Sequence, residues 1–159
     1  MSMRVTLDQA LVSGWFGVGL PEDARTRLAA IAEVRSLEPE TVVIREGEPV
    51  DSLGIVVDGR MAIRLAVPGR ASMTILTIEP GDCLGWSALV PPHRATSTIV
   101  AVERTSVVAF DGASLRVVMA EDPATESAIL RSVLEAVARR LIATRTQLLD
   151  LFARAGDEP

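Results

Sequence analysis

The stretch that decides the fold reads 79-EPGDCLGWSALVPPHRATSTIVA-101. It contains a PGD turn, two adjacent prolines, and a single arginine, Arg94, that stands beside the small residues Ala95 and Thr96. A guanidinium suits an anion in such a place, because it offers two parallel donors to phosphate oxygens and keeps its charge at any working pH. Trp86 stands eight positions before Arg94. The stretch therefore predicts a tight, turn-rich segment that holds an anion.

Short runs rich in β-branched residues fill the chain from Thr41 to Phe110. The runs are TVVI, LGIVV, MAIRLAV, MTILTI, TSTIVAV and TSVVAF, and turn sequences such as REGEP, VPGR and EPGD separate them. Runs of this length at regular spacing are typical of a β-sandwich or barrel. Asp58-Gly59 is the strongest hairpin signal among the turns. We therefore expect a mainly β domain of about eight strands, with a hairpin at Asp58-Gly59.

Helical patterns flank the β-region on both sides. Residues 21–34 predict a helix, because Pro21 suits the first turn, acidic residues follow it, and apolar residues recur on one face. After the last β-run, GASLRVVMA predicts a short helix. Asp122 and Pro123 then form an N-cap pair, and residues 124–153 contain neither glycine nor proline. This last segment predicts a helix roughly 45 Å long.

The predicted long helix carries an apolar seam with alternating spacings of four and three. Its members are Leu130, Leu134, Val137, Leu141, Thr144, Leu148 and Leu151. A heptad pattern of this kind is typical of a helix that pairs with a second helix. The helix is also longer than one small domain can cover, so we expect a homodimer. The expected interface residues are Leu130, Leu134, Val137, Leu141 and Leu148. The alternative is a monomer whose helix lies flat on its own barrel.

Composition argues against several classes of function. The chain has 159 residues and a net charge of −5, and all its basic residues are arginine. A chain of this size suits one domain, and the acidic balance argues against nucleic-acid binding. Cys83 is the only cysteine, so no intrachain disulfide forms, and neither a signal peptide nor a membrane span is visible. We expect a cytoplasmic protein with no metal site, no membrane contact and no enzyme activity, since no catalytic motif is present.

Several segments, in order, resemble the cyclic nucleotide-binding domain, the effector domain of catabolite-activator-type regulators and of protein kinase A regulatory subunits. FGVGLPEDARTRLAAIAE is similar to the opening helix of that family, and VVIREGEPVDSLGIVVDGRMAI to its glycine-marked strands. LTIEPGDCLGWSAL with RATS resembles the phosphate-binding cassette, and ARRLIATR resembles the central helix that meets the base. The resemblance implies an antiparallel jelly roll, or double-stranded β-helix, with an N-terminal helix and a long C-terminal helix. It implies one domain over 1–159, helical at 1–35, jelly roll at 36–111 and helical again at 112–154.

The resemblance also implies a ligand and the residues that bind it. The ligand would be a cyclic nucleotide, cAMP or cGMP, and no other cofactor is indicated. Arg94 would hold the cyclic phosphate, assisted by backbone N–H groups of a short helix at Ser87, Ala88 and Leu89, and Thr144 would meet the base. The implied ligand-binding residues are Gly85, Trp86, Ser87, Ala88, Arg94, Ala95, Thr96 and Thr144. The alternative for Arg94 is a surface residue that leaves a turn.

Trp86 is where the sequence departs from the family. It stands where the family has an acid that accepts a hydrogen bond from the ribose 2′-hydroxyl, whereas indole offers one donor and no acceptor. Loss of that partner is expected to weaken cyclic nucleotide binding about ten- to hundredfold. Three roles for Trp86 follow: it stacks on a different planar anion, it fills the pocket itself, or it packs in the core.

The expected function is a regulatory domain that senses a phosphate-bearing small molecule and binds cyclic nucleotides weakly. The alternative is a ligand-free scaffold dimer that kept the fold. Nothing in the chain resembles a helix-turn-helix module, so we expect a stand-alone effector domain. Its signal would pass through the dimer helix or to a partner protein.

Overall fold

The computed structural model describes residues 7, 10–11 and 18–155. Its elements are, in chain order, α2 (Glu22–Ile31), β1 (Ala32–Leu37), β2 (Val42–Ile44), β3 (Ser52–Asp58), β4 (Met61–Leu65), β5 (Met73–Ile78), β6 (Cys83–Leu84), a 3₁₀ turn η3 (Trp86–Ala88), β7 (Thr98–Ala101), β8 (Thr105–Asp111), α3 (Gly112–Glu121) and α4 (Pro123–Ala155). No helix in this part of the chain is long and apolar enough to cross a membrane.

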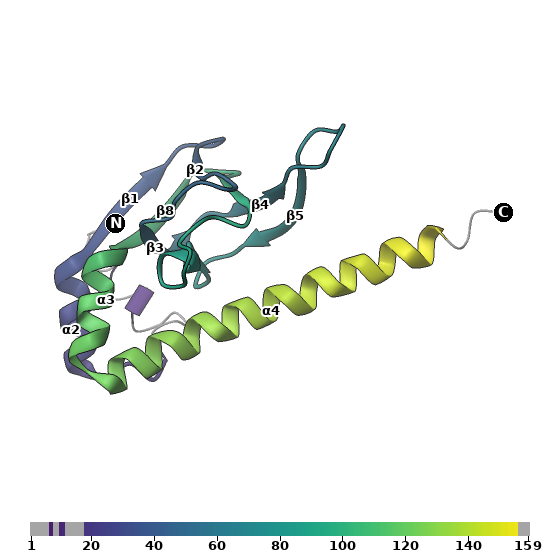
Figure 1. The fold of residues 1–159 in the computed structure, drawn as a ribbon. Helices are drawn as coiled ribbons and strands as arrows, with labels where there is room; N and C mark the ends of the chain where they lie inside the picture. Colours follow the sequence, from purple (N-terminus) through teal and green to yellow (C-terminus); the bar gives the residue numbers. More distant parts are fainter. Residues whose placement is uncertain (1–6, 8–9, 12–17, 156–159) are drawn as a thin grey trace.

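Two antiparallel four-stranded sheets form the body of the domain (Figure 1). Their strand orders are β1-β8-β3-β6 and β2-β7-β4-β5. Four successive residues of β3, from Leu53 to Val56, are buried. Because successive side chains of a strand point to opposite faces, both faces of β3 are covered. Leu53 and Phe110 pack toward the helices, while Val56, Met61 and Ile78 belong to the apolar cluster that both sheets build. The predicted jelly roll with an N-terminal helix and a long C-terminal helix is confirmed.

The first helix is shorter than predicted. The sequence predicts a helix over 21–34 within a helical segment to 35, but α2 ends at Ile31 and β1 begins at Ala32. Val34 fits the apolar face of a helix and also the inner face of a strand. Along its whole length β1 pairs with β8, and this ladder of hydrogen bonds outweighs one further helical turn. The jelly roll therefore begins inside the segment predicted as helical.

The turn at Asp58-Gly59 does not form the predicted hairpin. β3, which ends at Asp58, belongs to the first sheet, and β4 belongs to the second. Gly59 has a φ of +85°, and a Cβ at this position would clash with the carbonyl oxygen of Arg104. The signal is correct for a tight turn that requires glycine. The chain passes at this turn from one sheet to the other, so the two flanking strands do not pair.

α4 is 33 residues long and begins where the sequence predicts. The Asp122 carboxylate accepts hydrogen bonds from the backbone N–H groups of Ala124 and Thr125, at 3.2 and 3.3 Å, as an N-cap residue does. The first half of the helix packs on the core through Ile129 and Val133. The second half projects beyond the barrel, past β4 and β5 (Figure 1). The helix thus has one half packed on the domain and one half that extends away from it.

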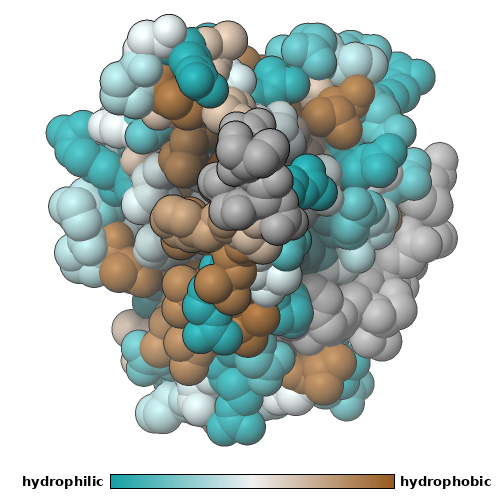
Figure 2. All heavy atoms as spheres, turned by 90° about the vertical axis from the view of Figure 1, so that its right-hand side faces the viewer, coloured by the Kyte–Doolittle hydropathy of each residue, from teal (hydrophilic) through white to brown (hydrophobic). Residues whose placement is uncertain are grey.

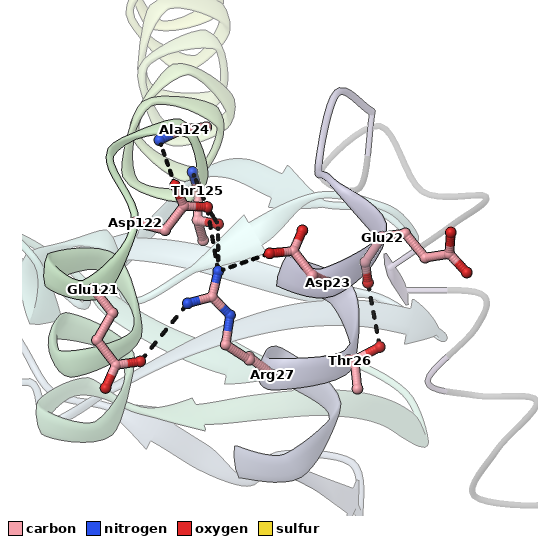
Figure 3. Close-up of polar contacts among 8 residues, drawn as sticks. All are labelled: Glu22, Asp23, Thr26, Arg27, Glu121, Asp122, Ala124 and Thr125. Atoms are coloured by element: carbon pink, nitrogen blue, oxygen red, sulfur yellow. Dashed lines mark hydrogen bonds and ion pairs between the residues drawn. The ribbon is translucent and has the colours of Figure 1, made fainter.

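Arg27 of α2 ties the first helix to the junction of α3 and α4 (Figure 3). Its Nη2 lies 3.2 Å from Oδ2 of Asp122 and 3.3 Å from Oδ2 of Asp23, and its Nη1 lies 3.7 Å from Oε2 of Glu121. Asp122 also accepts a hydrogen bond from the Thr125 hydroxyl at 2.6 Å. Three helices therefore meet at one guanidinium.

This junction predicts a pH-dependent contribution to stability. The Thr125 hydroxyl, with the N–H of Ala124 and the charge of Arg27, holds the pKa of Asp122 below its ordinary value. The carboxylate therefore stabilises the folded state above its unfolded pKa of about 3.9, and this contribution is lost as the pH falls through the lower folded-state pKa. We expect Asp122→Asn to lower Tm near neutral pH, and the gap between wild type and variant to close below about pH 4. Thermal denaturation against pH measures the gap.

The control for this prediction is Asp150→Asn, which removes an exposed carboxylate of the projecting half of α4. We expect it to change Tm little at any pH, because surface substitutions away from such contacts are close to neutral. A gap for Asp122→Asn that stays constant down to about pH 3 would show that the carboxylate charge contributes nothing.

Candidate ligand-binding site

A cavity of about 330 Å³ lies between the second sheet, the turn after β6 and the middle of α4. Its volume is at the lower end of the roughly 300–1,000 Å³ that is usual for small-molecule sites. Much of the wall is made of branched apolar side chains from the strands and the loops next to them, namely Ile44, Val50, Ile63, Leu65, Ile75, Leu76 and Ile99. The turn after β6 and α4 supply the rest, so the cavity brings together segments far apart in the sequence.

The turn that forms one side of the cavity begins at a residue that must be glycine. Gly85 has a φ of +76°, and a Cβ there would clash with the carbonyl oxygen of Ser52. The 3₁₀ turn Trp86–Ala88 follows directly and presents its first residues to the cavity. The GDCLGWSAL sequence thus folds as a short strand, a left-handed glycine and a single tight turn.

Two side chains hold this turn in place from behind. Nη1 of Arg116, on α3, donates to the carbonyl oxygen of Ala88 at 2.7 Å. Nδ1 of His93 lies 2.9 Å from the carbonyl oxygen of Ser87, within hydrogen-bond distance. Neither residue is among those expected from the sequence to bind a ligand. The contact with Arg116 supplies a donor to a carbonyl group at the end of the short turn, and the contact with His93 adds to the backbone hydrogen bond that Ser87 accepts from Val90 at 3.3 Å.

Six of the predicted ligand-binding residues line the cavity. They are Gly85, Trp86, Ser87, Ala95, Thr96 and Thr144. Ala88 is instead buried in a small cluster with Val50 and Ala95. Two of the expected interface residues, Val137 and Leu141, also line the cavity. The structure therefore brings the turn and the helix predicted from the sequence to one place.

Arg94 has an exposed side chain and is not among the residues that line the cavity. Its Nη1 donates to the carbonyl oxygen of Gly47 at 2.9 Å. Backbone hydrogen bonds at 2.8 Å, from Gly47 to Ala95 and from Ala95 to Glu48, hold the segment in this register. Ala95 is buried while the Arg94 side chain lies outside. The guanidinium predicted to hold a phosphate thus binds a neutral carbonyl group in this structure, and its role toward a ligand stays a prediction.

Trp86 is half-buried, lines the cavity, and also packs against the core below the helices. Among the described residues that line the cavity, none is Asp or Glu. The site therefore has no carboxylate to accept a hydrogen bond from a sugar hydroxyl, and indole cannot replace one. Within the described residues there is also no group of three or more His, Cys, Asp or Glu side chains that could hold a metal ion.

Arg140 is the charged residue of the cavity that the sequence analysis missed. Only 15% of its side chain is exposed. Its Nη2 donates to the carbonyl oxygen of Cys83 and lies 3.4 Å from Oδ2 of Asp82, while its Nε is buried without a hydrogen-bond partner. The signal that could have found it is spacing, because Arg140 stands four residues before Thr144 and so lies on the same face of α4.

Asp82, in the PGD turn, contacts two successive arginines of α4. Its Oδ1 lies 3.4 Å from Nη2 of Arg139 and accepts the backbone N–H of Cys83 at 2.8 Å, and its Oδ2 faces Arg140. Burial raises the pKa of the Cys83 thiol to about 11, so this side chain stays a neutral thiol and adds no charge. One carboxylate thus connects the turn before β6 to the helix that closes the cavity.

We expect Asp82→Asn to lower the free energy of unfolding by about 1–3 kcal/mol, because it removes the carboxylate that faces the largely buried guanidinium of Arg140. Urea denaturation measures the change. The control is Glu103→Gln, which breaks a pair with Arg60 at 3.8 Å in which both side chains are about half exposed. Pairs of that kind are worth about 0–1 kcal/mol. Equal losses for the two variants would mean that Asp82 is an ordinary surface carboxylate.

Comparison with known proteins assigns the fold to a family. The profile of the cyclic nucleotide-binding domain matches residues 34–122, more than half of the chain. The chain therefore belongs to the cyclic nucleotide-binding domain family. It is 30% identical over 110 residues to the CRP-like cAMP-activated global transcriptional regulator of Mycobacterium tuberculosis, a match that covers 69% of this chain and 47% of that protein. The chain thus spans about half the length of that relative.

Solved structures of the family share the fold over nearly the whole chain. A protein of Geobacter metallireducens GS-15, described as a cyclic nucleotide-binding protein, superposes with a TM-score of 0.74 at 24% identity and covers 89% of this chain and 99% of its own. A cyclic nucleotide-binding domain of Methylobacillus flagellatus KT reaches a TM-score of 0.78 at 15% identity, over 92% of this chain and 82% of its own. At these identities the likeness shows the fold and not the ligand.

Proposed function

We propose that the chain is a regulatory ligand-binding domain, and that a small phosphate-bearing anion binds in the cavity between the second sheet and α4. The observation that carries the proposal is one cavity lined by the turn at Trp86 and Ser87 and by Arg140 and Thr144 of α4. An anion that enters the barrel leaves water, and a largely buried guanidinium offsets that cost. Cyclic AMP and cyclic GMP are weak ligands in this proposal, because the cavity offers no carboxylate to the ribose.

In this proposal, the effect of ligand binding in the cavity is transmitted to the rest of the molecule through α4. Val137, Arg140, Leu141 and Thr144 of this helix all line the cavity. A ligand that contacts these side chains changes the packing of the middle of the helix. The proposed regulatory output is therefore a change in the position of α4. No catalytic role is proposed, and a cytoplasmic location is supported by a lone cysteine that is buried as a free thiol.

We further propose that α4 pairs with the α4 of a second copy. Large apolar side chains on it are exposed, namely Leu130, Leu134, Leu141, Ile142, Leu148, Leu149, Leu151 and Phe152. In the view along the direction in which α4 projects, hydrophobic residues gather in the middle of the molecular face (Figure 2). A heptad seam that is apolar at all positions but Thr144 is self-complementary, so a twofold dimer covers it on both subunits at once. A separate partner protein then receives the signal from this dimer.

Arg94 is proposed as a second anion contact at the edge of the cavity. It directly precedes Ala95 and Thr96, which line the cavity, and its guanidinium makes one hydrogen bond to the carbonyl oxygen of Gly47. A charge-assisted pair with phosphate is stronger than that bond to a neutral carbonyl. A phosphate group at the rim would therefore draw the side chain away from Gly47.

A specific observation favours a second function, a scaffold dimer without a ligand. Trp86 lines the cavity and is held by packing against the core on its other side. A side chain held in this way fills space that a ribose needs. In this alternative the apolar seam of α4 is the only functional surface, and the cavity is residual.

Isothermal titration calorimetry with cAMP, cGMP and cyclic di-nucleotides tests the proposal. We expect weak binding to the wild type, and we expect Trp86→Glu to tighten cAMP binding about ten- to hundredfold, because it supplies the missing acceptor. Trp86→Phe is the matched control: it also shortens the side chain but adds no acceptor, so it should gain little. Arg94→Ala should weaken binding if the guanidinium turns to the phosphate.

The two functions give opposite results in this experiment. If no nucleotide gives heat or raises Tm with the wild type or with Trp86→Glu, the scaffold is favoured, because a ligand of the folded state must raise Tm. If Trp86→Phe gains as much affinity as Trp86→Glu, the indole acts by its size and not by its lack of an acceptor.

A further inference from the structure

We infer that the ligand of this cavity is an anion with a compact charged head and an apolar, sugar-free body, and that Arg140 binds its head. The inference rests on the proposed function, since it names the chemical class of the molecule that the cavity takes. It goes further in one respect. The family fold by itself suggests a nucleotide, whereas the side chains of this cavity favour a ligand without ribose.

The charged head follows from the state of Arg140. Only 15% of its side chain is exposed, and both contacts of its guanidinium, to the carbonyl oxygen of Cys83 and to Asp82, use the same nitrogen, Nη2. The residue lines the cavity, so an anionic oxygen there would offset part of the cost of burying this cation. Asp82 faces Nη2 only, at 3.4 Å. The site therefore offers one partly neutralised cation, which matches a small anion better than a highly charged one.

The apolar body follows from the opposite wall. β4 and β5 contribute Ile63, Leu65, Ile75 and Leu76, and no polar side chain of these two strands lines the cavity. Trp86 adds a flat indole beside them. Burial of a hydrocarbon chain or ring against such a surface is favourable, and the free energy gained grows with each methylene. A sugar placed there would lose its water and find no carboxylate to accept its hydrogen bonds.

The remaining polar groups are hydroxyls that cannot replace a ribose site. They belong to Ser87, Thr96, Ser97 and Thr144. A hydroxyl accepts a weaker hydrogen bond than an ionised carboxylate does. Such groups suit the oxygens of a phosphate or carboxylate head, to which each can donate one hydrogen bond. Charge complementarity and the apolar wall thus point to the same class of ligand.

A homologous series of ligands tests the inference on the full chain. Butyl, hexyl and octyl phosphate are titrated calorimetrically beside inorganic phosphate, ribose 5-phosphate and cAMP. We expect the affinity to rise up to about fourfold for each added methylene. We expect octyl phosphate to bind at least tenfold more tightly than ribose 5-phosphate. Octanoate, which keeps the chain and changes the head, shows whether phosphate or carboxylate is preferred.

Variants locate the binding. Arg140→Gln should lose tenfold or more in affinity for octyl phosphate, and Arg104→Gln, which removes an exposed arginine paired with Glu38, should lose nothing. Thr144→Glu is a second test that does not depend on a buried residue, because Thr144 is exposed and yet lines the cavity. A carboxylate there should weaken the binding of every anion about tenfold or more. Octyl phosphate binding that neither Arg140→Gln nor Thr144→Glu weakens would overturn the inference.

The outcomes separate this inference from the proposed function. If cAMP or ribose 5-phosphate binds more tightly than octyl phosphate, the cavity is a sugar-binding site and the inference alone fails. If octanoate binds and the phosphates do not, the apolar anion stands and the phosphate in the proposed function fails. If no probe binds to a protein that melts cooperatively, both fail and the scaffold alternative remains.

Discussion

Replacing Leu134 and Leu148 by glutamate is expected to convert a dimer into a monomer. Both side chains are exposed seam residues, at 67% and 52%, and neither lines the cavity. Each substitution removes a leucine from the proposed interface twice, once in each subunit. At about 1.5–3 kcal/mol for each buried leucine, the double variant loses more than about 5 kcal/mol of dimer stability, over a thousandfold in Kd. Sedimentation velocity over a range of concentrations measures it.

Thr146→Glu with Gln147→Glu is the matched control for the dimer. It places two carboxylates on the same projecting half of α4, at exposed positions outside the heptad seam. We expect this control to sediment as the wild type does. A wild type that is already monomeric at every concentration would refute the proposed dimer. A dimer that survives both leucine replacements would place the interface elsewhere.

Gly85→Ala is expected to cause a large loss of stability at the centre of the candidate site. The residue has a φ of +76°, which costs an L-residue about 1–2 kcal/mol. Its Cβ would in addition clash with the carbonyl oxygen of Ser52, a backbone atom that cannot rotate away. Overpacking of this kind costs a further 1–3 kcal/mol or so. Chemical denaturation measures the sum, and displacement of the turn should also abolish ligand binding.

Gly69→Ala separates the two contributions to this loss. Gly69 has a φ of +74°, almost the same as Gly85, but a Cβ there would meet nothing within 4 Å. It should therefore lose only the conformational part. If the two variants are equally unstable, the backbone at Gly85 and Ser52 moves apart at no cost in free energy, and the clash predicted from the geometry does not contribute.

The order of helices and strands could be predicted because the apolar residues of most segments recur with one clear period, either that of a strand or that of a helix. Alternating β-branched runs and thirty residues without glycine or proline leave few options for the barrel and for α4. The end of α2 cannot be placed from the sequence, because Val34 fits both the helical and the strand period, and only its pairing with β8 decides between them. Asp58-Gly59 correctly marks a tight turn, but local sequence does not say to which sheet the next strand belongs.

The candidate site was predicted in part. The residues of the turn, Gly85 to Ser87, and Thr144 of α4 were expected together, and they line one cavity. Arg140 does not stand out in the sequence, because an arginine beside another arginine on a helix resembles a solvated face. Its burial depends on Asp82 and Cys83, which are distant in sequence. The outward direction of Arg94 likewise depends on its hydrogen bond to Gly47, which no motif encodes.

The projecting half of α4 makes the helix a lever. Thr144 lies at the cavity, and the helix continues from there to Ala155, about 16 Å further at 1.5 Å per residue. A tilt of about 10° at the cavity would therefore move the far end by about 3 Å, roughly half of one helical turn. A rearrangement of a few side chains is enlarged in this way into a displacement that another protein can detect at a distance from the bound molecule.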